Sequence, residues 1–345
     1  MQTERIRRFL LVSLALLTSL AWLAEPRLPQ VVNYFSLRAV FMQYSGAIAI
    51  GAMSLAMMLA LRPRWLEPHL DGLDKIYRLH KWLGITALGV SVLHWWAGRG
   101  TKWMVGWGWL TRPVRGPRPA AEDRGLVEAW LAGQRGLAET VGEWAFYAAA
   151  VLMVLALVRR FPYHLFAKTH TWLAALYLAL VFHSVVLVKF PYWGQPLGWV
   201  LAALMAGGGF AAVRLLMPGG AGAHRRVRAT VEALERFPTA GALEIRVVAD
   251  PGWPGHAPGQ FAFLTTDPKE GAHPYTLASA WDPASRRLTF IAKALGDHTR
   301  RLPDELRVGQ PVTLEGPYGR FLFEDGRPRQ IWIGAGIGIT PFIAR

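Results

Sequence analysis

The chain has 345 residues, of which 52% are hydrophobic, with no cysteine and a formal net charge of +15 at pH 7. The lack of cysteine excludes disulfides, thiolate catalysis, iron–sulfur clusters and cysteine-ligated zinc, so any metal is expected to bind histidine or carboxylate. The positive charge does not indicate nucleic-acid binding, because the arginines gather beside apolar runs, as in loops that face anionic lipid. These clusters are Arg5, Arg7 and Arg8; Arg62 and Arg64; Arg159 and Arg160; and Arg225, Arg226 and Arg228. We therefore expect a lipid bilayer as partner and no nucleic acid.

Six apolar runs are long enough to cross a bilayer core of about 30 Å. They lie near residues 7–24, 39–61, 79–98, 141–158, 168–189 and 196–217. We interpret the first as an uncleaved anchor, with a signal peptide cleaved after Ala21 or Ala24 as the alternative. With both termini in the cytoplasm, the basic clusters fall in cytoplasmic loops, as the positive-inside rule requires, except in the loop 99–139. The sequence thus predicts a multi-pass protein of the cell (inner or plasma) membrane.

From about His224 the pattern changes to short alternating runs separated by glycine, proline and aspartate, which indicates β-strands. The predicted strands are VRATVEAL, ALEIRVVA, QFAFLTT, YTLAS, RLTFIAKA and PVTLEG, with a further strand at QIWIGA. Their close spacing predicts a small antiparallel barrel. We therefore expect a helical membrane bundle over residues 1–223, an antiparallel β-barrel over 224–327, and the incomplete start of an α/β nucleotide-binding domain over 328–345.

Four histidines lie within the apolar runs, where an ionisable side chain is costly and usually functional. His80 and His94 are 14 positions apart on the third run, and His170 and His183 are 13 apart on the fifth. Because these two helices run in the same direction, His80 can face His170 and His94 can face His183. Two facing imidazoles suit a six-coordinate haem iron, so we predict two b-type haems as cofactors.

The four histidines have alternative interpretations. Any one of the four histidines taken alone could simply hydrogen-bond a carbonyl group. A single zinc site is excluded, because zinc needs three or four ligands close together. At about 100° per residue, His170 and His183 lie roughly 140° apart around an ideal helix, which the pairing leaves unexplained. Tyr177 lies midway between them, either between two haems or packed in the core.

The β-type region contains two motifs that suit a flavin, one in a predicted strand and one at a predicted helix start. A strand with an aromatic and a hydroxyl group can stack an isoalloxazine ring, and free N–H groups at a helix start favour a diphosphate. Each of these motifs taken alone is also compatible with an ordinary barrel turn, and for HPYTLAS alone that is the favoured reading. The predicted FAD-binding residues are His273, Pro274, Tyr275, Thr276, Leu277, Ser279, Gly296, Asp297, His298 and Thr299.

A glycine-rich turn at the C-terminal end follows an apolar run. Such a turn between a strand and a helix lets backbone amides approach a pyrophosphate. The predicted NAD(P)H-binding residues are Gly334, Gly336, Gly338, Thr340 and Pro341. We assign no residue as a catalytic acid, base or nucleophile.

Taken together, these motifs resemble the ferric reductase and NADPH oxidase superfamily, in which a six-helix haem domain is joined to a ferredoxin-reductase-type FAD and NAD(P)H module. The resemblance is carried by HKWLGITALGVSVLH, HTWLAALYLALVFH, HPYTLAS, IAKALGDHT and GAGIGITPF. It implies an NAD(P)H-dependent oxidoreductase in which electrons pass from NAD(P)H to FAD, then to the inner haem at His80 and His170 and the outer haem at His94 and His183.

The resemblance leaves the electron acceptor open between oxygen, which would give superoxide, and a ferric chelate. Oxidase members carry an arginine and a histidine near the outer haem; Arg38 fits the first, but Gly98 stands at the second position. A haem cytochrome subunit that passes electrons between quinone and a partner protein is the alternative function. A transporter that uses the histidines as proton relays is a third reading.

Overall fold

The structure is a computed structural model that describes residues 2–25, 32–112, 125–158, 160–321, 323 and 329–345. It divides into two compact units. A helical unit comprises Met1–Pro63 and Lys75–Gly220, and a sheet unit comprises Arg64–Asp74 and Ala221–Arg345. The sheet unit therefore includes one short segment that comes from between two long helices.

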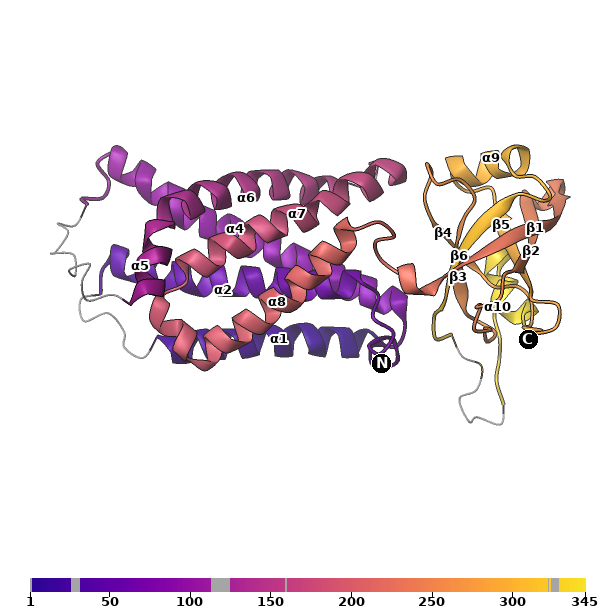
Figure 1. Ribbon diagram of the computed structural model, residues 1–345, viewed down its shortest axis with the longest axis horizontal. Coiled ribbons are helices and arrows are strands. Elements are labelled where there is room, and N and C mark those ends of the chain that lie inside the picture. The colour runs from indigo at the N-terminus through magenta and orange to yellow at the C-terminus, as the bar shows by residue number, and fades with distance from the viewer. Residues whose placement is uncertain (1, 26–31, 113–124, 159, 322, 324–328) are drawn as a thin grey trace. The chain divides into compact units, whose positions relative to one another are not determined.

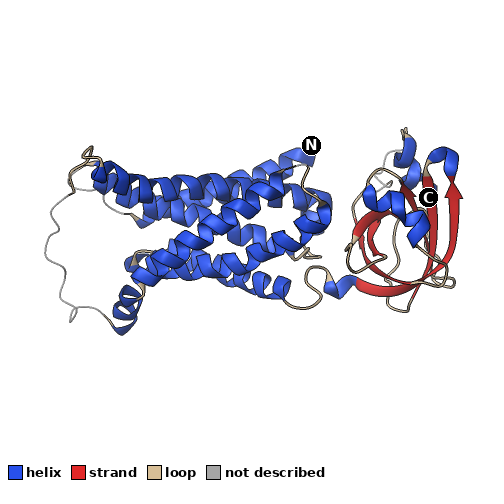
Figure 2. Cartoon of the chain, turned by 90° about the horizontal axis from the view of Figure 1, so that it is seen from above, coloured by secondary structure: helices blue, strands red, loops and turns tan. Residues whose placement is uncertain are grey.

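The helical unit consists of long helices that lie side by side (Figures 1 and 2). They are α1 (Gln2–Ala24), α2 (Tyr34–Ala60), α4 (Leu73–Gly106), α6 (Arg135–Leu157), α7 (Tyr163–Leu187) and α8 (Pro196–Leu216), with the shorter α5 (Leu126–Gly133) and η2 (Phe190–Gly194). Each of the six predicted apolar runs overlaps one long helix, and four of them extend one or two residues past its C-terminal end. Residues 113–124 of the predicted outer loop lie outside the described residues.

Five helices within the described residues are long and apolar enough to cross a membrane: α1, α2, α6, α7 and α8. α4 is not among them, because histidine, tryptophan and glycine residues interrupt its apolar run and lower its mean hydropathy. The structure therefore has a helical membrane region with five candidate spans, and the predicted sixth span is the helix that carries His80 and His94.

The core of the helical unit lies where α2, α7 and α8 pack together, with α1 added on one side. Tyr177 is fully buried there, and its hydroxyl lies 2.7 Å from the Ser54 hydroxyl oxygen. A Cβ on Gly208 would lie 2.2 Å from the Tyr177 hydroxyl oxygen, so only glycine leaves room for it. Of its two possible roles, Tyr177 takes that of a packed core residue.

The sheet unit is built on six antiparallel strands in the order β4-β3-β6-β1-β2-β5. They are β1 (Arg226–Phe237), β2 (Ala242–Ala249), β3 (Phe261–Thr265), β4 (His273–Thr276), β5 (Arg287–Lys293) and β6 (Pro311–Tyr318). Each of the first six predicted strands overlaps one of them. Their inward apolar side chains, such as Ile245, Phe290 and Leu314, form the core, against which helix α9 (Asp297–Glu305) buries Leu302.

The strand predicted at QIWIGA is wrong. Residues 329–335 are irregular, and Ile331 and Ile333 are 90% and 86% exposed. A strand needs a neighbour to accept and donate its backbone hydrogen bonds, and no strand among the described residues pairs with this segment. It is followed by the short helices η5 (Gly336–Ile339) and α10 (Thr340–Ile343).

Candidate functional site

The four predicted histidines come together as two facing pairs between α4 and α7. The ring centres of His80 and His170 are 6.0 Å apart, and those of His94 and His183 are 6.4 Å apart. An imidazole nitrogen binds a metal at about 2 Å, so two ligands on opposite sides of one ion have ring centres roughly 6 Å apart. The spacing of each pair therefore suits one ion between the rings, despite the predicted angular mismatch on α7.

Two of the rings are held by backbone carbonyls of other helices. Nδ1 of His80 lies 2.9 Å from the carbonyl oxygen of Ala56 in α2, and Nδ1 of His183 lies 2.8 Å from that of Ala138 in α6. A carbonyl accepts only from a protonated Nδ1, so Nε2 of each ring is left as the acceptor nitrogen. Metal-ligating histidines commonly show this arrangement, in which the second ring nitrogen donates to a carbonyl.

The other two rings differ in how they are held. Nδ1 of His94 lies 2.9 Å from the Ser45 hydroxyl oxygen, and Ser45 donates to the Phe41 carbonyl, so its oxygen accepts from His94. His170 stacks on Phe166, with ring centres 4.8 Å apart. Its buried Nδ1 has no hydrogen-bond partner among the described residues. Three of the four rings thus carry the orienting bond expected of a metal ligand, and His170 does not.

Glycine provides the space for the ring of His183. A Cβ on Gly142 in α6 would lie 1.9 Å from Nδ1 of His183, so any side chain there would displace the ring. Ser45 and Gly142 were not among the predicted site residues. A hydroxyl group within an apolar run and a glycine within a transmembrane helix were the available sequence signals, but neither identifies its partner.

Polar groups surround the segment of α4 that follows His94. Arg38 donates from Nε to the Ala97 carbonyl oxygen at 2.7 Å, which places it about one turn beyond His94. Arg99 forms an ion pair with Glu143 of α6. Tyr147 donates to the same carboxylate at 2.6 Å. The predicted Arg38 therefore lies near the pair formed by His94 and His183.

The sheet unit brings two predicted flavin motifs together. His273 on β4 stacks on His298 of α9, with ring centres 4.0 Å apart and an angle of 9° between the ring planes. Burial lowers the pKa of both imidazoles, and His298 lowers that of His273 further. Gly296 is the N-cap residue of α9, where Thr299 Oγ1 accepts from its backbone N–H at 3.1 Å. The β4 strand and the start of α9 therefore form one side-chain cluster.

The remaining predicted flavin residues have mixed surroundings. Tyr275 is buried, its hydroxyl has no partner among the described residues, and burial raises its pKa to about 12. Leu277 is fully buried and forms an isolated antiparallel β-bridge with Phe290 of β5. The Ser279 hydroxyl accepts from the Thr289 N–H at 3.1 Å. Pro274, Thr276 and Asp297 lie in β4 and the first turn of α9.

The predicted nicotinamide residues lie at the end of the chain. Gly334 is in the irregular segment, Gly336 and Gly338 are in η5, and Thr340 and Pro341 open α10. Gly336 has a positive φ of 55°, a conformation that glycine adopts without strain. The glycine-rich turn therefore exists, without a paired strand before it.

Part of the helical unit matches a known protein family. Residues 45–181 match the family described as "Ferric reductase like transmembrane component". This stretch is therefore similar to the transmembrane component of ferric reductases. It contains His80, His94 and His170 and ends two residues before His183. The resemblance to this superfamily is thereby confirmed.

The chain is also similar to a ferredoxin–NAD(+) reductase component over part of its length. It is 32% identical over 106 residues to the ferredoxin–NAD(+) reductase component of an alkene monooxygenase system from Xanthobacter autotrophicus, a match that covers 30% of this chain and 32% of the relative. The match thus spans about a third of that relative.

Solved structures with partial similarity are of the same kind. The ferredoxin reductase in carbazole 1,9a-dioxygenase, in an FAD apo form, is 25% identical with a TM-score of 0.30, covering 34% of this chain and 37% of that one. A ferredoxin NADP+ reductase from Neisseria gonorrhoeae with bound FAD and NADP is 19% identical with a TM-score of 0.28, covering 35% and 50%.

Proposed function

We propose that the chain is an NAD(P)H-dependent oxidoreductase that carries electrons across a membrane, from NAD(P)H through FAD and two b-type haems to an acceptor outside the cytoplasm. The family match and the likeness to a ferredoxin reductase support electron transfer across a membrane in general. The observation that carries the haem proposal is the presence of two facing histidine pairs at two heights between α4 and α7.

The residues that would hold the inner haem are His80 and His170, and those for the outer haem are His94 and His183. Bound flavin and haem supply the conversion of a two-electron donor into one-electron steps. The chain's contribution is orientation. The Ala56 carbonyl orients the His80 ring, and each pair of histidines would hold one haem iron so that the acceptor would be reduced without binding the metal.

The residues of α2 that orient the histidines support two haem positions at different heights along that helix. Ser45 contacts His94 and Ala56 contacts His80. These two residues are 11 positions apart, which corresponds to about 16 Å of helix. In this proposal α4 is the sixth membrane span, both termini lie in the cytoplasm, and residues 1–223 form the haem domain.

For FAD we propose a site on residues 224–327. We also propose that the sheet closes into a barrel, which the isolated β-bridge between Leu277 and Phe290 supports. The cluster of His273 and His298 would meet the diphosphate, together with the N–H groups at the start of α9. Residues 328–345 would contribute to NAD(P)H binding, with the glycines from Gly334 to Gly338 facing the pyrophosphate of the nucleotide.

The acceptor is proposed to be oxygen or a ferric chelate, reduced near the pair of His94 and His183. Arg38 supplies a positive charge close to that pair, which would attract an anionic chelate or stabilise superoxide. Gly98 offers no second polar group at the position where oxidase members of the resembled superfamily carry histidine.

Sealed proteoliposomes test this function. The protein is inserted into vesicles that contain either ferric citrate or cytochrome c, and FAD with NADPH is added outside. We expect reduction of the trapped acceptor in wild type and its loss in His94→Leu. Reduction of cytochrome c that superoxide dismutase abolishes would identify oxygen, and direct reduction of ferric citrate would identify the chelate. Equal reduction in His94→Leu and wild type would contradict the proposed route.

A further inference from the structure

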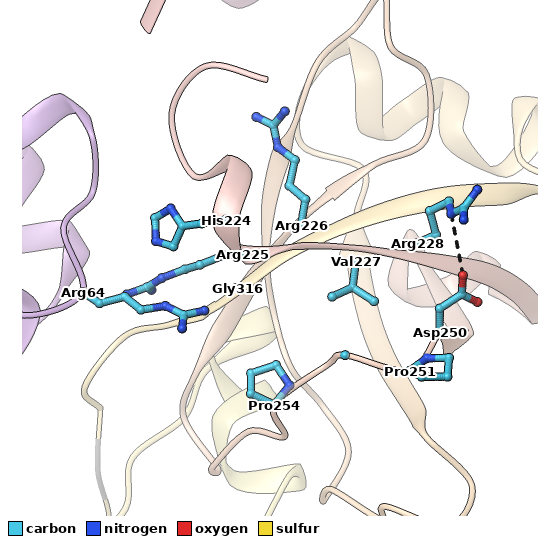
Figure 3. A pocket seen from close by; sticks show the side chains of 11 residues that line it. Arg64, His224, Arg225, Arg226, Val227, Arg228, Asp250, Pro251, Pro254 and Gly316 are labelled. Carbon is cyan, nitrogen blue, oxygen red and sulfur yellow. Dashed lines mark ion pairs between the residues drawn. The ribbon is translucent and has the colours of Figure 1, made fainter. Parts of the chain in front are cut away.

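Arginines from two distant parts of the sequence line a single cavity of about 340 Å³ in the sheet unit (Figure 3). Arg64 comes from the segment after α2, whereas Arg225, Arg226 and Arg228 come from η3 (Ala223–Arg225) and β1. Figure 3 shows Arg64 and Arg225 extending toward one another from these separate segments. Two basic clusters that are 160 residues apart in sequence therefore contribute to one site.

Three of these arginines have a carboxylate partner within the sheet unit. Arg226 lies 3.0 Å from Glu315, and Arg228 lies 3.8 Å from Asp250, a pair in which both side chains are largely exposed. For Arg64, no carboxylate partner is found among the described residues. The four arginines that line the cavity therefore outnumber their carboxylate partners.

Arg225 is the buried member of the set. Its side chain is only 5% exposed, and Nη1 donates to Glu67 and to the Pro317 carbonyl, each at 3.1 Å. The guanidinium also lies over the ring of Tyr318, 4.3 Å from its centre. These contacts fix the position of the group before any ligand arrives, as in a preformed binding site.

The same side chain has an unsatisfied donor. Nε of Arg225 is buried and has no hydrogen-bond partner among the described residues. A buried charged donor without a partner is energetically costly, so native proteins rarely contain one without an acceptor. An acceptor oxygen inside the cavity would satisfy this group.

The chemistry of the lining selects the ligand. Guanidinium groups present forked N–H donors that match phosphate oxygens and are strongest when both partners are charged. Gly252 and Gly316 line the cavity without side chains, which leaves space for a tetrahedral group. Four arginines, of which three pair with a carboxylate, favour an anion over a cation or a neutral sugar.

The segments that line the cavity follow two predicted membrane spans closely in sequence. Arg64 follows the last residue of α2 by 4 positions and His224 follows that of α8 by 8, segments that reach at most about 14 and 29 Å. Basic clusters immediately next to membrane spans bind anionic lipid headgroups. We propose that this cavity binds a phosphate group, either that of an anionic phospholipid headgroup or free phosphate.

The test uses the whole protein in phosphatidylcholine nanodiscs. Binding of dansyl-phosphatidylglycerol is followed by energy transfer from tryptophan, and binding of inorganic phosphate by equilibrium dialysis with a radiolabel. Arg64→Gln removes the lining arginine that has no carboxylate partner and so is expected to leave the fold intact. Arg246→Gln is the matched control, because it removes the same charge from strand β2, outside the cavity.

We expect Arg64→Gln to weaken phosphatidylglycerol binding about fivefold, as one arginine near a lipid surface predicts, while Arg246→Gln leaves it unchanged. That result supports the site and identifies a lipid headgroup. Phosphate binding that falls in Arg64→Gln, without a change in phosphatidylglycerol binding, supports the site and identifies free phosphate. Arg64→Gln and Arg246→Gln behaving alike toward both probes would overturn the proposal.

Discussion

At the scale of single residues, three of the four histidine rings are held by a helix other than their own. Ser45 and Ala56 of α2 contact His94 and His80 on α4, and Ala138 of α6 contacts His183 on α7. The ring orientations therefore depend on how α2 and α6 pack, so substitutions on these two helices should affect metal binding without touching a ligand.

Gly142 provides the sharpest case. In Gly142→Ala the new methyl group would lie 1.9 Å from Nδ1 of His183, so the ring must move and one of the two proposed haems should be lost. Gly136→Ala is the control on the same helix, since a Cβ at Gly136 meets nothing within 4 Å. Haem per chain, measured as pyridine haemochrome, should halve in the first variant only. Equal haem content in both would show that this contact does not hold the ring.

Ser45→Ala should weaken one haem without abolishing it. Loss of an orienting hydrogen bond typically reduces metal affinity about 10–100-fold. The rate of haem transfer to apomyoglobin measures this change. Ser13→Ala is the control, because the Ser13 hydroxyl likewise donates to the carbonyl four residues earlier but contacts no histidine. Unchanged transfer from Ser45→Ala would mean that Ser45 does not orient His94.

At the scale of elements, the Glu67 carboxylate links helix α3 (Glu67–Leu70) to the rest of the sheet unit. Glu67 accepts from Arg225 at 3.1 Å and from the Gly319 backbone N–H at 2.8 Å. Both side chains of the ion pair are largely buried. The short segment between α2 and α4 therefore packs where β1 begins and β6 ends, although it is far from both in sequence.

Glu67→Ala should destabilise the sheet unit strongly. Removing one partner of a buried ion pair leaves an uncompensated charge, which costs about 3–5 kcal/mol. Glu235→Ala is the control, because its pair with Arg246 is about half exposed and such pairs contribute at most about 1 kcal/mol. Hydrogen exchange of the β1 amides in the whole protein gives the free energy of opening. Similar changes in the two variants would rule out the proposed role of Glu67.

Acid should destabilise the cluster between β4 and α9. Burial lowers the folded-state pKa of His273 and His298, so the unfolded chain binds more protons. Their contribution to stability is then complete above the unfolded pKa of about 6.5 and is lost as pH falls through the lowered values. The thermal midpoint of the sheet unit should fall between about pH 7.5 and about pH 5.5, and fall less in His298→Gln. An identical pH dependence in both proteins would exclude this pair as the cause.

At the scale of the whole molecule, sequence patterns were sufficient for most elements. Long apolar runs predicted the helices, and alternating runs such as ALEIRVVA, which is β2, predicted the strands. The strand at QIWIGA was wrong because strand formation depends on a pairing neighbour, which a local pattern does not contain. The predicted angular mismatch of His170 and His183 did not prevent either ring from lying close to its partner on α4.

Contacts between distant segments were not predictable from one sequence. The histidines could be paired because their spacing repeats on two helices. No such repeat relates Ser45 to His94, Gly142 to His183, or Arg64 to Arg225. These contacts depend on how helices and loops pack after the chain has folded, so they emerge only from the structure.

The two histidine pairs are the centre of the proposed route for electrons, and haem stoichiometry tests them most directly. The pyridine haemochrome spectrum of the dithionite-reduced protein should give two b-type haems per chain. It should give one in His80→Leu and in His94→Leu, and two in His69→Leu, in which the altered histidine is exposed and belongs to α3. Absence of b-type haem from the wild-type protein, or two haems retained in His80→Leu and His94→Leu, would contradict the account.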